Sequence, residues 1–86
     1  MRTALILATL QQLHAIHPNG MRAADLTTGI RLMGFPKETP DSLTSLLHDM
    51  QGLDLVTCKP DTLDASVILW TRTEAGRVEL VKHGHA

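Results

Sequence analysis

The 86-residue sequence predicts one mainly helical α+β domain, with a core of three helices, a β-hairpin and a C-terminal helix. Three segments in the first 52 residues carry apolar side chains at the spacing of an amphipathic helix. Two β-rich runs follow, LDLVTC (53–58) and ASVILWTR (65–72), joined by KPDTLD, which places Pro and Asp where turns prefer them. Because no linker or repeat divides the chain, we expect residues 1–86 to form a single domain.

The first two helices are separated by HPNG (17–20), where Pro and Gly end the first helix. We expect that helix from residue 3 to about residue 17. Its apolar stripe consists of Leu5, Ile6, Leu10, Leu13 and Ile16. Met21 and Arg22 are predicted to form a very short strand. A second helix then begins at about Ala23, and its stripe consists of Leu26, Ile30 and Met33.

The third helix, expected at about 40–51, has the strongest local signals. GFPKETP (34–40) cannot continue the second helix, because two prolines lie within seven residues. Thr39 is predicted to cap the third helix, with Pro40 in its first turn and Asp41 at the positive end of its dipole. Its apolar stripe consists of Leu43, Leu46, Leu47 and Met50. Gly52 is expected to end this helix, and Leu53 to pack just after it.

The C-terminal part is expected to form the hairpin and the last helix. Lys59 is predicted to lie at the hairpin tip, and Trp70, in the return strand, to be a core or dimer-face residue. The run TEAGRVELVKH then begins with Thr73 as a possible helix cap. Val78 and Val81 are expected to supply the packing face of that last helix.

Composition and charge limit the possible partners. Apolar residues make up 43% of the chain and charged residues 20%, as in ordinary globular proteins. The net charge is −1, so the field of the whole protein would not attract nucleic acid. The acids are concentrated in residues 37–64, which hold six acids and two lysines. Phe35 and Trp70 are the only aromatic residues, so stacking of nucleic-acid bases on aromatic rings is nearly excluded.

The single cysteine and the hydropathy of the chain indicate where in the cell the protein is expected. The single cysteine, Cys58, excludes an internal disulfide and fits a reducing environment. The apolar run ALILATL (4–10) is too short to cross a bilayer, and no small-residue cleavage site of a signal peptide is evident after it. We therefore expect a soluble, cytoplasmic protein without membrane contact.

Two local patterns resemble a known family. LTSLLHDMQGLDLV is similar to the family's recognition helix, which leads into the wing through leucine, glycine, leucine and valine. LWTRTEAGRVEL is similar to the return strand of the wing and the helix start that follows it. With a looser match at AADLTTGI (23–30), almost the whole chain resembles the winged helix-turn-helix domain of small bacterial and phage transcription regulators. GFPKETP is longer than the tight turn typical of that motif, which leaves the angle between the second and third helices open.

This resemblance implies a DNA-binding transcription regulator, with the third helix in the major groove and the 53–72 hairpin as the wing. Ser and Thr hydroxyls and the His48 imidazole would then bond base edges, while cations on neighbouring elements hold phosphates. The implied DNA-binding residues are Arg22, Arg31, Lys37, Ser42, Thr44, Ser45, His48 and Lys59. A homodimer through the first and last helices would double the number of contacts.

Two alternatives to DNA reading remain open. The polar residues of the third helix are equally compatible with a solvated helix face. The chain could also be a winged-helix adaptor or anti-regulator that contacts a basic protein surface and no DNA. In that case the acids of the third helix and hairpin would carry the interaction, and they are Asp41, Asp49, Asp54, Asp61 and Asp64.

Other chemistry finds little support. The sequence contains no nucleophile motif with a Gly-rich elbow and no Gly-rich phosphate loop, so we expect no enzyme. The side chains that could act as the ligands of a metal sensor are His14, His17, His48, Cys58, His83 and His85. Since no CxxC or HExxH spacing unites them, we interpret them as scattered surface histidines and a strand cysteine, and expect no cofactor.

Overall fold

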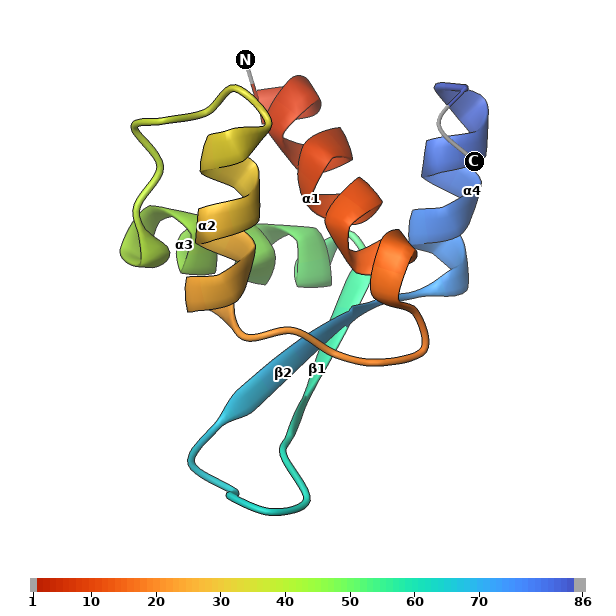
Figure 1. The fold of residues 1–86 in the computed structure, drawn as a ribbon. Coiled ribbons are helices and arrows are strands. Elements are labelled where there is room, and N and C mark those ends of the chain that lie inside the picture. The colour runs from red at the N-terminus through yellow and green to blue at the C-terminus, as the bar shows by residue number, and fades with distance from the viewer. Residues whose placement is uncertain (1, 85–86) are drawn as a thin grey trace.

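The computed structural model describes residues 2–84, which form four helices and one antiparallel hairpin (Figure 1). The elements are α1 (Arg2–Ile16), α2 (Ala23–Leu32), α3 (Pro40–Gly52), β1 (Val56–Pro60), β2 (Ile68–Arg72) and α4 (Glu74–Lys82). Helix α1 packs against both α2 and α4, α3 packs against α2, and the hairpin projects from the helical core. The predicted order of elements is confirmed. No helix of residues 2–84 is both long and apolar enough to span a bilayer.

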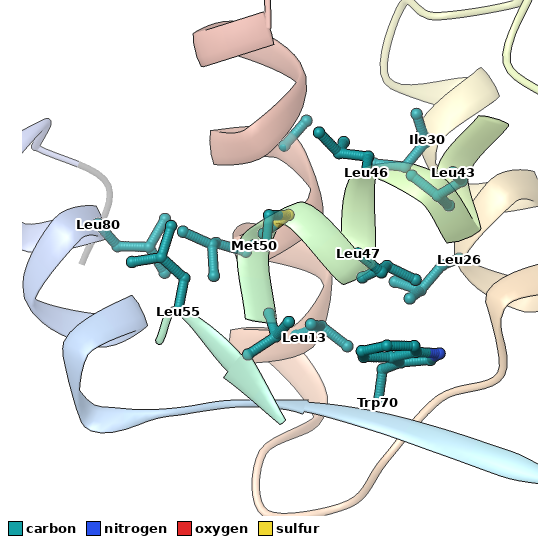
Figure 2. Close-up of a cluster of buried hydrophobic side chains, with 13 residues drawn as sticks. Leu13, Leu26, Ile30, Leu43, Leu46, Leu47, Met50, Leu55, Trp70 and Leu80 are labelled. Atoms are coloured by element: carbon teal, nitrogen blue, oxygen red, sulfur yellow. The ribbon is translucent and has the colours of Figure 1, made fainter. Parts of the chain in front are cut away.

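The core is built from aliphatic side chains, as the shortage of aromatic residues requires (Figure 2). The predicted stripe of α3 is buried along its length, and Leu10 and Leu13 of α1 and Leu26 and Ile30 of α2 meet it. Trp70 is only 3% exposed, which confirms its predicted place in the core. Met33 lies just beyond the end of α2 and is exposed, so its predicted place in the α2 stripe is wrong.

Two of the helix starts carry side-chain caps. The Thr39 hydroxyl accepts a hydrogen bond from the Ser42 amide at 3.2 Å, and the Ser42 hydroxyl accepts one from the Thr39 amide at 3.1 Å. At α4 the Thr73 hydroxyl accepts a hydrogen bond from the Gly76 amide at 3.1 Å. Both predicted caps are confirmed, and each satisfies an amide that the helix itself leaves without a partner.

The end of α3 at Gly52 is confirmed, but the turn after it differs from the prediction. Asp54 takes the left-handed conformation, with φ of 66°. The Asp54 amide donates to the Gln51 carbonyl and the Leu55 amide donates to the Met50 carbonyl, both at 3.0 Å. This pair of bonds turns the chain so that Leu55 is buried and Leu53 is 63% exposed. The prediction that Leu53 packs is therefore wrong.

The hairpin is shifted from its predicted bounds. Its pairing runs from Val56 opposite Arg72 to Pro60 opposite Ile68, so β1 starts and ends later and β2 starts later than predicted. Lys59 pairs with Leu69 within the strands, so its predicted position at the tip is wrong. The tip is residues 61–67, where Asp side chains bond nearby amides and replace strand pairing with local turns. Met21 forms a single bridge to Trp70, which confirms a very short strand there.

The packing face of α4 is also corrected. Val78 and Val81 are exposed, whereas Leu80 and Gly76 are buried. A Cβ atom at residue 76 would overlap the Leu55 carbonyl oxygen, so only glycine lets α4 approach the start of the hairpin this closely. The helix is thereby rotated so that its valines face solvent.

Candidate nucleic-acid interface

The exposed face of α3 presents Ser45 and His48 to solvent, on the side away from the buried stripe. The His48 ring meets the Trp70 ring edge to face, with centroids 5.4 Å apart and an interplanar angle of 85°. Since Trp70 is itself buried in the core, this contact orients the imidazole next to the base of the hairpin. Ser45 and His48 are therefore the side chains of this face best placed to meet a ligand.

Ser42 and Thr44 are already engaged within the protein. The Ser42 hydroxyl donates to Oε1 of Glu38 at 2.7 Å, in addition to its part in the cap of α3. The Thr44 hydroxyl donates to the Pro40 carbonyl at 2.7 Å and is half-buried. Both oxygens retain acceptor capacity, but their hydrogens are committed to the protein. Their predicted bonds to base edges would have to replace or share these contacts.

A hollow of about 380 Å³ separates α3 from the hairpin. It is lined by Ala23, Thr44, His48, Cys58, Ile68 and Trp70. These residues come from the start of α2, from α3 and from both strands, which are the elements predicted to approach DNA. The floor is apolar, while Thr44 and His48 add polar groups.

The predicted phosphate contacts are spread around this face. Arg22 immediately precedes α2, is exposed and pairs with Asp25 at 3.2 Å. Arg31 donates through Nε to the Glu38 carbonyl at 2.7 Å and so anchors the α2–α3 connection, in which Lys37 is exposed. The two arginines keep further N–H donors for phosphate. Arg22, Arg31 and Lys37 thus come from the two ends of α2 and from the connection that follows it.

Lys59 lies apart from these cations. Side chains alternate along a strand, and Cys58 lines the hollow beside α3. Lys59 therefore points to the opposite face of the hairpin, together with its partner Leu69. A phosphate held by Lys59 would lie on that other face.

Acids border the same surface. Asp41 and Asp49 are exposed on α3, and Asp61 and Asp64 lie at the hairpin tip. Hydrogen bonds from the Ser66 hydroxyl and then from its amide lower the pKa of Asp64, so this carboxyl is ionised at neutral pH. The tip sequence DTLDASV contains no cation, and phosphates close to it would be repelled.

The sequence reasoning missed Ala23, Ile68 and the hollow that they line. Alternation along the return strand could have placed Ile68 on the same face as Trp70. The register that sets Cys58 opposite Trp70 was not readable, because it depends on how the hairpin meets the helical core.

The four histidines within residues 2–84 are not part of any metal-binding cluster. Within residues 2–84, no group of three or more His, Cys, Asp or Glu side chains could hold a metal ion. His14 accepts a hydrogen bond at Nδ1 from Nε of Arg72, at 2.9 Å. His85, also considered as a ligand, lies outside the described residues.

Several solved structures of transcription regulators share this fold. ZitR of Lactococcus lactis, a zinc-responsive MarR family member, matches over 92% of this chain and 49% of its own, with 23% identity and a TM-score of 0.72. A mutant of S. aureus MepR bound to an oligodeoxyribonucleotide matches over 90% of this chain and 51% of its own, with 21% identity and a TM-score of 0.73. The adhesin competence repressor AdcR of Streptococcus pyogenes has 19% identity and a TM-score of 0.68, over 90% of this chain and 53% of its own.

The predicted winged helix-turn-helix fold is thereby confirmed. The chain spans about half the length of these neighbours. No protein-family model and no curated protein sequence matches it.

Proposed function

We propose that this chain is a DNA-binding transcription regulator whose helix α3 enters the major groove. The observation that carries the proposal is the exposed Ser45 and His48 face of α3, set beside a wing in a fold that the DNA-bound MepR mutant shares. A hydroxyl and an imidazole can both bond base edges, so a helix without Lys or Arg can contribute sequence preference. The proposed role is binding, with no catalytic step.

Phosphate contacts in this proposal come from neighbouring elements. Arg22 and Arg31 flank α2, and Lys37 lies in the connection that leads into α3. Lys59 would reach a phosphate from the other face of the hairpin. Because these cations are few and the net charge is −1, affinity should fall only modestly with salt.

We further propose that the protein acts in the cytoplasm as a homodimer through α1 and α4. These two helices pack side by side and leave an open groove of about 320 Å³. The groove is lined by Thr3, Ile6, Leu7, Leu53, Leu55, Glu79 and His83. The exposed Val78 and Val81 extend this apolar surface along α4. Two joined copies would present two recognition helices to a palindromic site.

Selection from a pool of random duplex DNA at low and moderate salt tests the DNA-binding proposal. An enriched motif should emerge, and a palindromic one would support the dimer. Ser45→Ala or His48→Ala should change the preferred bases, whereas Arg22→Ala or Lys37→Ala should weaken binding to all sequences. His17→Ala, an exposed histidine in the loop between α1 and α2, is the matched control and should change neither. Failure to retain any duplex at low salt would overturn the proposal and favour the protein-binding alternative.

A further inference from the structure

Two leucines are almost fully exposed, at opposite ends of the molecule. Leu32, the last residue of α2, is 86% exposed, and Leu63, in the hairpin tip, is 95% exposed. Figure 1 shows the α2–α3 connection at the top left and the hairpin tip at the bottom. The proposed DNA contacts and the proposed dimer through α1 and α4 use neither leucine.

The end of α2 and the following connection form a surface that we call the corner patch, consisting of Arg31, Leu32, Met33, Phe35 and Lys37. Beside Leu32 and Met33 the connection folds around a shallow hollow of about 260 Å³, lined by residues 34–38. The bond from Arg31 to the Glu38 carbonyl and the bond from the Phe35 amide to the Ile30 carbonyl hold this connection in place. The corner patch is therefore an ordered apolar surface with two cations, beside one acid, Glu38, whose carboxylate accepts a hydrogen bond from the Ser42 hydroxyl.

The hairpin tip has the opposite charge around a similar apolar centre. The Leu63 amide donates to Oδ1 of Asp61 at 3.2 Å, and the Ser66 amide donates to Oδ1 of Asp64 at 3.0 Å. These bonds shape the backbone on each side of Leu63. The tip thus displays one apolar side chain between two carboxylates.

We propose that the hairpin tip of one copy docks on the corner patch of a second copy. Leu63 would enter the hollow beside Leu32, while Asp61 and Asp64 face Arg31 and Lys37. Opposite charges beside matched apolar groups are the complementarity that a protein interface requires. Because the two surfaces lie at opposite ends of one chain, each copy offers both halves of the contact. Such a head-to-tail contact closes into a ring of copies or extends into an open row, depending on the rotation between neighbours.

The contact is small, so it should be weak in dilute solution and strengthen when copies are held close together. Acidic residues at the tip also make DNA a poor occupant of the same surface. The inference does not depend on the proposed DNA binding, although Arg31 and Lys37 take part in both proposals.

Sedimentation velocity at rising protein concentration tests the contact. All proteins should carry Val81→Glu, which removes an apolar group from the proposed α1–α4 dimer surface and leaves both leucines in place. We expect the sedimentation coefficient of this parent protein to rise with concentration. Leu63→Ser and Leu32→Ser should each abolish the rise. Leu53→Ser changes an exposed leucine that lines the α1–α4 groove but lies on neither docking surface, so it should leave the rise unchanged. A parent coefficient that does not rise, or a rise that survives Leu63→Ser, overturns the proposal.

A charge exchange adds a second test. Asp64→Lys makes the tip less acidic, and Lys37→Glu makes the corner patch less basic, so each variant alone should associate less than the parent. An equimolar mixture should recover the association, because it offers two matched contacts: the altered tip on the altered patch, and the unaltered tip on the unaltered patch. Circular dichroism checks that both variants are folded. A mixture that sediments as the average of its two components contradicts the inference, whatever the outcome of the DNA experiment.

Discussion

The two ends of the hairpin are held by different physical effects. At the base, Leu55, Val56 and Trp70 are buried among α1, α3 and α4, and Gly76 of α4 lies against the Leu55 carbonyl oxygen. At the tip, residues 61–67 make no comparable packing contacts and are shaped by the side chains of Asp61 and Asp64. The same two strands thus pass from a region held by burial to one held by local hydrogen bonds.

This difference separates two tasks of the hairpin. The base positions His48 through Trp70 and brings α4 against the end of α3, so changes there should act on stability and on the α3 surface together. The tip is free to contact other molecules, and changes there should act on binding with little effect on folding. Substitutions at both ends test whether the base controls stability and the tip controls binding.

The largest expected difference is between Trp70→Ala and Leu63→Ala. Removing the buried indole should lower the free energy of unfolding by about 3–5 kcal/mol, because it leaves a cavity among the core leucines. Removing the exposed leucine should change that free energy by no more than about 0.5 kcal/mol. Urea unfolding followed by circular dichroism measures both. Similar losses for the two variants would show that the tip is packed after all.

Gly76→Ala should be the next most damaging change at the base. The added Cβ would overlap the Leu55 carbonyl oxygen, so α4 must shift, at a cost of about 1–3 kcal/mol. Gly52→Ala is the matched control, because nothing lies within 4 Å of its added Cβ. That control should hold or raise stability, by up to about 1 kcal/mol, since alanine favours helix more than glycine does. Thermal unfolding of the two variants would decide whether the close approach of residue 76 to the Leu55 carbonyl oxygen causes the loss of stability.

A gain in stability is expected from Asp54→Gly. Asp54 has a φ of 66°, which is the left-handed backbone conformation. This conformation is unfavourable for a residue with a Cβ atom, and glycine adopts it without that penalty. The gain should be about 0.5 kcal/mol, reduced by the greater freedom of glycine in the unfolded chain. The neighbouring Leu53→Gly, at a φ of −89°, should instead lower stability. If both glycines destabilise the protein equally, backbone conformation is not what limits this turn.

The smallest expected effect is on how the stability of the hairpin tip depends on pH. Hydrogen bonds from Ser66 hold the pKa of Asp64 below its ordinary value. The Asp64 carboxylate therefore stabilises the folded tip above the ordinary pKa, and this contribution is lost as the pH falls through the lowered pKa. Ser66→Ala should move the pKa of Asp64 upward, as an NMR titration would detect, and Thr62→Ala should not. An unchanged pKa of Asp64 in Ser66→Ala would show that the Ser66 hydroxyl does not stabilise the Asp64 carboxylate.

Local chemistry explains which predictions from sequence succeeded. The start of α3 was readable from Thr39, Pro40 and Asp41, because a cap depends on atoms only a few residues apart. The apolar stripe of α3 was readable from its spacing for the same reason. The reciprocal bond from Ser42 was missed, since the residue at that position of a capping box is usually Glu or Gln. The exposure of Ser45 and His48 was inferred correctly, and their role in DNA binding stays a prediction.

The sequence by itself determined the order of elements, the caps of α3 and α4 and the aliphatic character of the core, because these depend on neighbouring residues and on composition. Only the tertiary structure decided that Lys59 lies inside β1, that Leu55 rather than Leu53 is buried, and that Gly76 rather than the α4 valines meets the core. Each of these outcomes depends on contacts between residues distant in the chain. Strand register and helix rotation follow from fitting whole elements together, and local propensities do not encode that fit.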